Sequence, residues 1–162
     1  GVGSTFWLEI AAEPAAARAV ASDSLEPVLE DLNILVVEDN PTNRMIATKL
    51  LEAMGAKVDT ADDGYLGVEA AAAGAFDLIL MDVQMPGIDG LEAARRIRAL
   101  GGPASQTPIV ALTANVLSHQ RAAYIDAGMD GVVGKPISPS VLIGEIARLS
   151  QSQADCNETV AA

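Results

Sequence analysis

The sequence lacks several features that would define a class of protein on their own. Cys156 is the only cysteine among 162 residues, so the chain can form no internal disulfide, as is usual in reducing compartments. No run reaches the roughly 18 uncharged apolar residues of a membrane span, and the start has no signal-peptide pattern. We therefore expect a soluble cytoplasmic protein, with Cys156 facing solvent in a polar tail.

Basic residues are scarce as well. Lys and Arg number 10 against 22 Asp and Glu, which gives a formal net charge of −12 at pH 7. A surface that binds nucleic acid needs a concentration of basic side chains, and none is visible. The composition therefore argues against direct nucleic-acid binding. Because 50% of the residues are hydrophobic, the chain can still build a sizeable core, and its length suits one domain with additional tails.

The central part of the chain is more regular than its two ends. Residues 1–10 are glycine-punctuated, and residues 11–31 are rich in Ala, Ser, Pro and acids, a composition typical of a linker with some helical tendency. A regular pattern occupies residues 32–150. Residues 151–162 are polar again, and we expect a flexible tail there.

Short apolar runs alternate with helical patterns five times in the regular part. The runs are NILVVED, AKVDTA, DLILMD, PIVALTA and GVVGK, and the helical patterns cover residues 41–55, 64–73, 90–100, 114–128 and 138–151. Five such units predict a parallel sheet with helices on both faces, because right-handed crossovers place the helices there. The runs ILVV, LILM and IVAL are continuously apolar, as buried parallel strands require. We predict an α/β doubly wound, flavodoxin-like fold with strand order 2-1-3-4-5.

Three acids stand where two of these strands end. Glu38 and Asp39 follow the first strand, and Asp82 ends the third. In doubly wound sheets, ligands bind outside the carboxyl ends of the strands where the strand order reverses, here between the first and third strands. Carboxylates gathered there repel one another unless a cation joins them. Mg²⁺ is the predicted cofactor because it favours oxygen ligands and binds through one or two carboxylates, with Mn²⁺ as the alternative ion.

Two further strand ends carry complementary groups. Thr113 ends the fourth strand and Lys135 follows the fifth. Taken singly, an acid or threonine at a strand end is more often a helix cap, and a lysine is more often a surface charge. Together, a hydroxyl, an ammonium, a metal and a carboxylate describe a site for a phosphoryl group. Because a carboxylate can attack phosphorus, an aspartyl phosphate on Asp82 is the candidate intermediate.

The motifs VVEDN, LILMDVQMPGIDG, ALTA and GKP closely resemble those of response-regulator receiver domains, over about residues 32–150. The resemblance implies that Asp82 accepts a phosphoryl group from a phosphohistidine in a Mg²⁺-dependent reaction. It implies that Asp39, Asp82 and the backbone carbonyl of Gln84 bind the ion directly, while Glu38 acts through water.

The same resemblance assigns contacts to the phosphoryl oxygens. Thr113 and Lys135 are the residues that match the family's contacts. The peptide between Lys135 and Pro136 is expected to be cis.

The motifs VEDNPTNR and MDVQMPGIDG are similar to the corresponding motifs in receiver domains of hybrid histidine kinases. GVGSTFW looks like the last glycine-rich motif and strand of a kinase ATP-binding domain, although a chance linker is the alternative. We interpret residues 1–10 as a remnant of that domain, 11–31 as a linker, 32–150 as the receiver and 151–162 as the tail. The implied partners are the histidine-bearing dimerisation domain of the kinase and a histidine phosphotransfer protein. The parent kinase can be membrane-anchored, but we expect no direct membrane contact by this fragment.

We expect no ATP-dependent kinase activity from the fragment itself. The rest of a nucleotide site is missing, and His119 is the only histidine. It is followed by Gln120 rather than the acid usual in a phosphoacceptor motif. We therefore interpret His119 as an ordinary helix residue.

One position departs from the family pattern. Many receivers place an aromatic residue three positions before the lysine, where it moves inward as Thr113 approaches the phosphoryl group, but this chain has Val132. Tyr124 on the preceding predicted helix is a candidate replacement. Gln84 and Asn115 are predicted to modulate how water reaches the phosphoryl group, and hence its lifetime.

The first predicted helix offers a docking surface. Its core-facing stripe consists of Ala47, Leu50, Leu51 and Met54. Met45 points nearly opposite and Ile46 flanks the stripe, so both are candidates for contact with a histidine-bearing helical bundle. The alternative is that they are ordinary exposed apolar residues.

Three functions are consistent with these sequence features. The leading one is a phosphorelay receiver that takes a phosphoryl group on Asp82 and passes it to a histidine phosphotransfer protein. The second is a regulatory receiver whose docking controls its own kinase. The third, a small hydrolase, is disfavoured because Gln84 occupies the position where aspartate-based phosphatases often keep a general acid.

Overall fold

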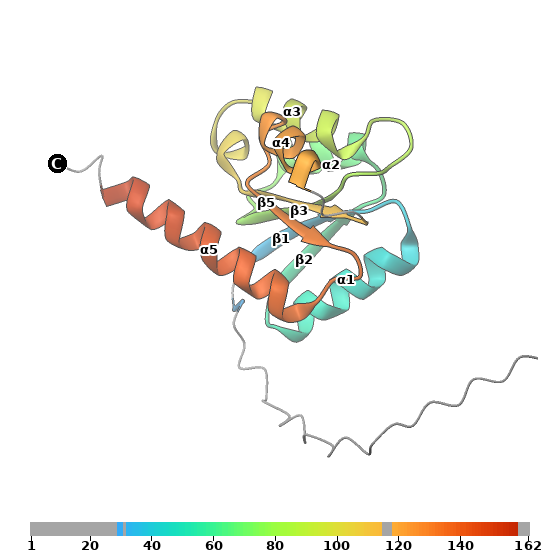
Figure 1. Cartoon of the computed structure of the whole chain (residues 1–162), viewed down its shortest axis with the longest axis horizontal. Coiled ribbons are helices and arrows are strands. Elements are labelled where there is room, and N and C mark those ends of the chain that lie inside the picture. The colour runs from blue at the N-terminus through green and yellow to red at the C-terminus, as the bar shows by residue number, and fades with distance from the viewer. Residues whose placement is uncertain (1–28, 31, 115–117, 159–162) are drawn as a thin grey trace, which may run out of the picture.

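The fold is a five-stranded parallel sheet between two layers of helices (Figure 1). The structure is a computed structural model that describes residues 29–30, 32–114 and 118–158. The sheet order is β2-β1-β3-β4-β5, and every pairing is parallel. The strands are β1 (Asn33–Val37), β2 (Lys57–Ala61), β3 (Leu78–Asp82), β4 (Ile109–Thr113) and β5 (Gly131–Gly134). The predicted fold class and strand order are confirmed.

The helices divide between the two faces of the sheet. They are α1 (Pro41–Ala53), α2 (Gly64–Ala73), α3 (Gly90–Ala99), η1 (Pro103–Gln106), α4 (Ser118–Asp126) and α5 (Pro139–Glu158). Helices α1 and α5 pack on one face, where Leu51 and Leu142 join a core with Val36 of β1. Helices α2, α3 and α4 cover the other face, where Ile97 and Tyr124 join the second core (Figure 1).

Burial on both faces explains the apolar runs. Every residue of β3 and β4 is buried, as are the last four residues of β1. The edge strand β2 is different, because Lys57, Asp59 and Thr60 are exposed. The three central strands therefore form a rigid support for whatever their carboxyl ends carry.

Side-chain caps fix where three helices begin, close to the carboxyl edge of the sheet. The Oδ1 of Asn40 accepts hydrogen bonds from the backbone N–H groups of Thr42 and Asn43, at 2.9 and 3.3 Å, and α1 starts on a proline. Asp63 caps α2 and Asp89 caps α3 in the same way, each at 2.8 Å. These caps orient the loops that follow β1, β2 and β3.

The structure differs from the sequence-based expectations at the ends of elements. Helix η1 was not predicted; it starts on Pro103 after Gly101 and Gly102, whose φ angles are +72° and +66°. Helix α5 continues to Glu158, past the predicted domain end at residue 150. Leu50, predicted to face the core, is only partly buried.

The folded unit begins earlier than the predicted boundary at residue 32. Leu29 is buried in the core beside α1, and its backbone N–H donates to the carbonyl of Met54 at 3.0 Å. The interpretation of residues 1–10, and of 11–31 apart from Leu29 and Glu30, lies outside the described residues. Among the described helices, none combines the length and hydrophobicity needed to cross a bilayer.

Candidate active site

Three carboxylates meet at the carboxyl edge of the sheet. Glu38 and Asp39 directly follow β1, and Asp82 is the last residue of the neighbouring strand β3. One oxygen from each group lies within 4.8 Å of the others. Glu38 and Asp82 are only 1% and 4% exposed, and Asp39 is half-buried. The predicted convergence of acids from two distant segments is present in the fold.

Lys135 joins this cluster from the loop after β5. Its Nζ lies 2.6 Å from Oε2 of Glu38 and 2.7 Å from Oδ2 of Asp82. Burial alone would lower the pKa of the Lys135 ammonium, but hydrogen bonds to Asp82 and then to Glu38 outweigh it and raise this pKa. Two buried carboxylates therefore share a cation that stays charged at neutral pH.

Glu38 is held by two residues of α1 that the sequence analysis did not identify. Asn43 donates from Nδ2 to Oε1 of Glu38 at 2.9 Å, and Arg44 donates from Nη1 to the backbone carbonyl of Glu38 at 2.7 Å. Arg44 also pairs with Asp62 at 3.2 Å. The sequence feature that could have identified Asn43 and Arg44 is the helix cap at Asn40. This cap places the first turn of α1 beside the end of β1.

The loop after β3 is shaped to pass close to Asp82. The backbone N–H of Gln84 donates to Oδ1 of Asp82 at 3.1 Å. Gly87 has a φ of +85°, a conformation that favours glycine. A Cβ on Gly90 would come within 2.9 Å of the Cα of Val83. Glycine at these two positions lets the loop turn back and begin α3 against the strand end.

Thr113 lies at the end of β4, one residue beyond the pairing of Leu112 with Asp82. Its Oγ1 is 3.2 Å from the hydroxyl oxygen of Tyr124 in α4, and the two residues are 5% and 4% exposed. A small pocket of about 300 Å³ lies beside the pair, and Gln84 contributes to its wall. The hydroxyl predicted to meet a phosphoryl group thus sits next to free space at the same edge.

The donor set of the acid cluster fits a hard divalent ion. Carboxylates supply oxygen only, and two of the three are buried, so their negative charge needs more compensation than water offers. Lys135 supplies one positive charge to Glu38 and Asp82. The three carboxylates still carry more negative charge than Lys135 neutralises, and a Mg²⁺ ion would neutralise the rest while keeping some of its bound water.

Comparison with known families supports the same description. The response regulator receiver domain family matches residues 34–147. The chain belongs to this family. The match covers β2 to β5 and all of β1 except Asn33, and it includes every strand-end residue discussed above.

The curated relatives of this receiver domain are longer sensor proteins. Sensor protein GacS of Pseudomonas syringae pv. syringae is 44% identical over 126 residues, which are 76% of this chain and 14% of that protein. Aerobic respiration control sensor protein ArcB of Escherichia coli is 40% identical over 162 residues, 99% of this chain and 21% of that protein. The chain thus spans about a fifth or less of these relatives.

A solved receiver domain adds information on the metal. The receiver domain of sensor histidine kinase PA1611 from Pseudomonas aeruginosa is 37% identical, with a TM-score of 0.67. The match covers 73% of this chain and 96% of that one. That structure has a magnesium ion coordinated in its active-site cleft.

The structure also locates the other residues to which the sequence analysis assigned a role. The peptide between Lys135 and Pro136 is cis, as the resemblance implied. Val132 is partly buried and packs against the core that contains Tyr124. Met45 and Ile46 are both 53% exposed on α1. Asn115 and the side chain of His119 lie outside the described residues.

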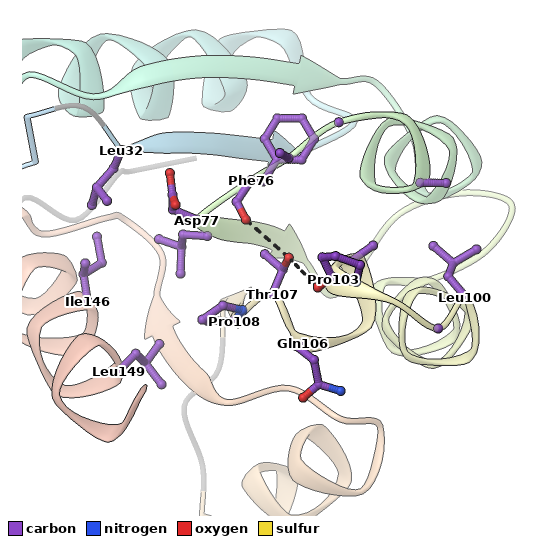
Figure 2. A pocket seen from close by; sticks show the side chains of 16 residues that line it. Leu32, Phe76, Asp77, Leu100, Pro103, Gln106, Thr107, Pro108, Ile146 and Leu149 are labelled. Carbon is purple, nitrogen blue, oxygen red and sulfur yellow. Dashed lines mark hydrogen bonds between the residues drawn. The ribbon is translucent and has the colours of Figure 1, made fainter. Parts of the chain in front are cut away.

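A larger pocket of about 660 Å³ lies at the opposite, amino-terminal edge of the sheet (Figure 2). Apolar side chains such as Leu32, Phe76 and Leu149 line it. Its acid, Asp77, accepts a hydrogen bond from the backbone N–H of Asn33 at 2.8 Å. The pocket lies at the other end of the strands from the carboxylate cluster and takes no part in it.

Proposed function

We propose that this receiver domain accepts a phosphoryl group on Asp82 from a phosphohistidine. The observation that carries the proposal is the buried contact of Asp82 with Lys135, inside a cluster of three carboxylates at the strand ends. In the reaction, a carboxylate oxygen of Asp82 attacks phosphorus and the N–P bond of the phosphohistidine breaks. The electron pair of that bond returns to the imidazole nitrogen.

Each residue of the site has a role in this step. Lys135 offers its ammonium and Thr113 its hydroxyl to the phosphoryl oxygens. Asp39, Asp82 and the backbone carbonyl of Gln84 would hold Mg²⁺, with Glu38 acting through water. When bound, Mg²⁺ neutralises negative charge on the transferring group. Asn43 and Arg44 keep Glu38 in place beneath the site.

We further propose that the chain is part of a hybrid histidine kinase. This is supported by its identity with GacS and ArcB, which are sensor proteins several times its length. Residues 1–10 are then the end of a kinase ATP-binding domain and 11–31 a linker. The phosphoryl donor is the histidine-bearing dimerisation domain, and a histidine phosphotransfer protein is the acceptor.

The chemistry is tested with acetyl phosphate and Mg²⁺, followed by intact-mass spectrometry. The wild type should gain one phosphoryl group, Asp82→Asn should gain none, and Asp77→Asn should behave like the wild type. Asp77 is a suitable control because it directly precedes β3, at the opposite end of the strand that Asp82 terminates. An equal adduct on Asp82→Asn, or none on the wild type, contradicts the assignment.

The relay is tested with a labelled phosphohistidine domain and a phosphotransfer protein. Label should pass through the wild type to the phosphotransfer protein, and should not pass through Asp82→Asn. If deletion of the receiver instead changes kinase autophosphorylation while no label moves onward, self-regulation replaces relay.

A further inference from the structure

The hydroxyls of Thr113 and Tyr124 form a buried pair behind the site. Their oxygens are 3.2 Å apart, and either can be the donor. Tyr124 lies in the last turns of α4, where its backbone carbonyl accepts a hydrogen bond from the N–H of Met129 at 2.9 Å. The Tyr124 ring therefore belongs to a helix end that is fixed by a backbone hydrogen bond, while Thr113 belongs to the buried strand β4.

The direction of this hydrogen bond matters once a phosphoryl group is present. A threonine hydroxyl has a single proton, and phosphoryl oxygens can only accept hydrogen bonds. If Thr113 donates its proton to a phosphoryl oxygen, it can no longer donate to Tyr124. The pair can then persist only if Tyr124 donates to Thr113. Phosphorylation thus converts a bond of either direction into a chain running from Tyr124 through Thr113 to the phosphoryl group.

Among the described residues, Tyr124 supplies a hydroxyl next to Thr113, whereas position 132 does not. Position 132 on the neighbouring strand β5 holds a valine, which has no hydroxyl and packs partly buried in the same core. The pocket of about 300 Å³ beside the pair is lined by Thr113, Tyr124 and Gln84. The pair of hydroxyls thus borders free space next to Gln84.

We propose that Tyr124 is a positioning residue that orients the Thr113 hydroxyl toward the phosphoryl group on Asp82. The inference rests on the proposed phosphorylation of Asp82 and adds to it a residue of α4. Because Tyr124 acts through Thr113, its hydroxyl should matter only while residue 113 also carries one. Phosphorylation would in turn fix the direction of the hydrogen bond that Tyr124, at the end of α4, makes with Thr113.

The test is a set of matched variants phosphorylated with acetyl phosphate and Mg²⁺. Tyr124→Phe removes only the hydroxyl, so the aromatic ring and its packing in the core are kept. It should slow formation of the adduct, or shorten its half-life, by about two- to tenfold, the range that one hydrogen bond covers. The same slowing should persist when Tyr124→Phe is combined with Thr113→Ser and vanish when it is combined with Thr113→Ala.

Tyr65→Phe is the control, because Tyr65 is exposed on α2 and lies against Arg96. It should leave rate and half-life unchanged. Equal slowing by Tyr124→Phe in the Thr113→Ala background, or no slowing in the wild type, overturns the role of Tyr124. A wild type that forms no adduct overturns the proposed function instead. Urea unfolding of each variant measures the stability cost of the lost hydrogen bond, so that rates and half-lives are compared at known stability.

Discussion

Lys135 donates from its Nζ to Oδ2 of Asp82 over 2.7 Å, and the two residues come from the ends of different strands. The contact joins the proposed nucleophile to a cation that also neutralises its neighbours. The contact fixes the position of the Asp82 carboxylate at the edge of the sheet. The backbone of Asp82 is fixed as well, because every residue of β3 is buried.

The raised pKa of Lys135 has a consequence for pH dependence. Because this pKa lies above the ordinary value of 10.5, the ammonium keeps its charge as pH rises through the neutral and mildly alkaline range. The rate of phosphorylation by acetyl phosphate should therefore show no loss from Lys135 titration between about pH 7 and 9.5. Lys135→Met should be slow at every pH. A wild-type rate that falls through this range while Lys135→Met stays flat would contradict the raised pKa.

Mg²⁺ should stabilise the folded domain, because only the fold brings the three carboxylates together. At a free concentration ten times its Kd, the ion should add about 1.4 kcal/mol to the free energy of unfolding. Urea titrations with and without Mg²⁺ measure this difference. Asp39→Asn should lose most of it, whereas Asp59→Asn, an exposed acid on the edge strand β2, should retain it. An undiminished Mg²⁺ effect in Asp39→Asn would place the ion elsewhere.

Two glycine substitutions should act in opposite directions. Gly90→Ala would press a Cβ against the backbone at Val83, within 2.9 Å, so it should lower the free energy of unfolding by about 1–3 kcal/mol. Gly144→Ala meets nothing within 4 Å inside α5, so the gain in helix propensity should stabilise by roughly 0.5–1 kcal/mol. Urea unfolding compares the two. Equal effects would mean that the close approach of the loop to Asp82 is not required.

Docking on α1 should be separable from chemistry. Ile46→Glu should slow transfer from a phosphohistidine domain by about tenfold, the loss expected for an interface contact near the site. Its rate with acetyl phosphate should not change, since that small donor needs no docking surface. Val141→Glu is the matched control, because Val141 on α5 is equally exposed at 53%. If both variants lose the same transfer rate, α1 is not the specific docking surface.

Much of the fold was predictable from local patterns. The apolar runs of β1, β3 and β4 follow from burial on both faces, and the parallel order follows from alternation with helices. The strand-end residues Asp39, Asp82 and Lys135 were predictable for the same reason, because parallel strands bring their carboxyl ends to one edge. Helix η1 was missed because its start depends on a proline that follows two glycines rather than on periodicity.

The sequence by itself therefore determined which groups stand at the edge of the sheet. Only the tertiary structure decided how these groups pair: that Lys135 bridges Glu38 and Asp82, that Asn43 and Arg44 hold Glu38, and that Tyr124 meets Thr113. Strand ends are positions along the backbone, which periodicity can indicate. Hydrogen bonds between side chains require positions accurate to a few tenths of an ångström, and those arise only when separate elements pack together.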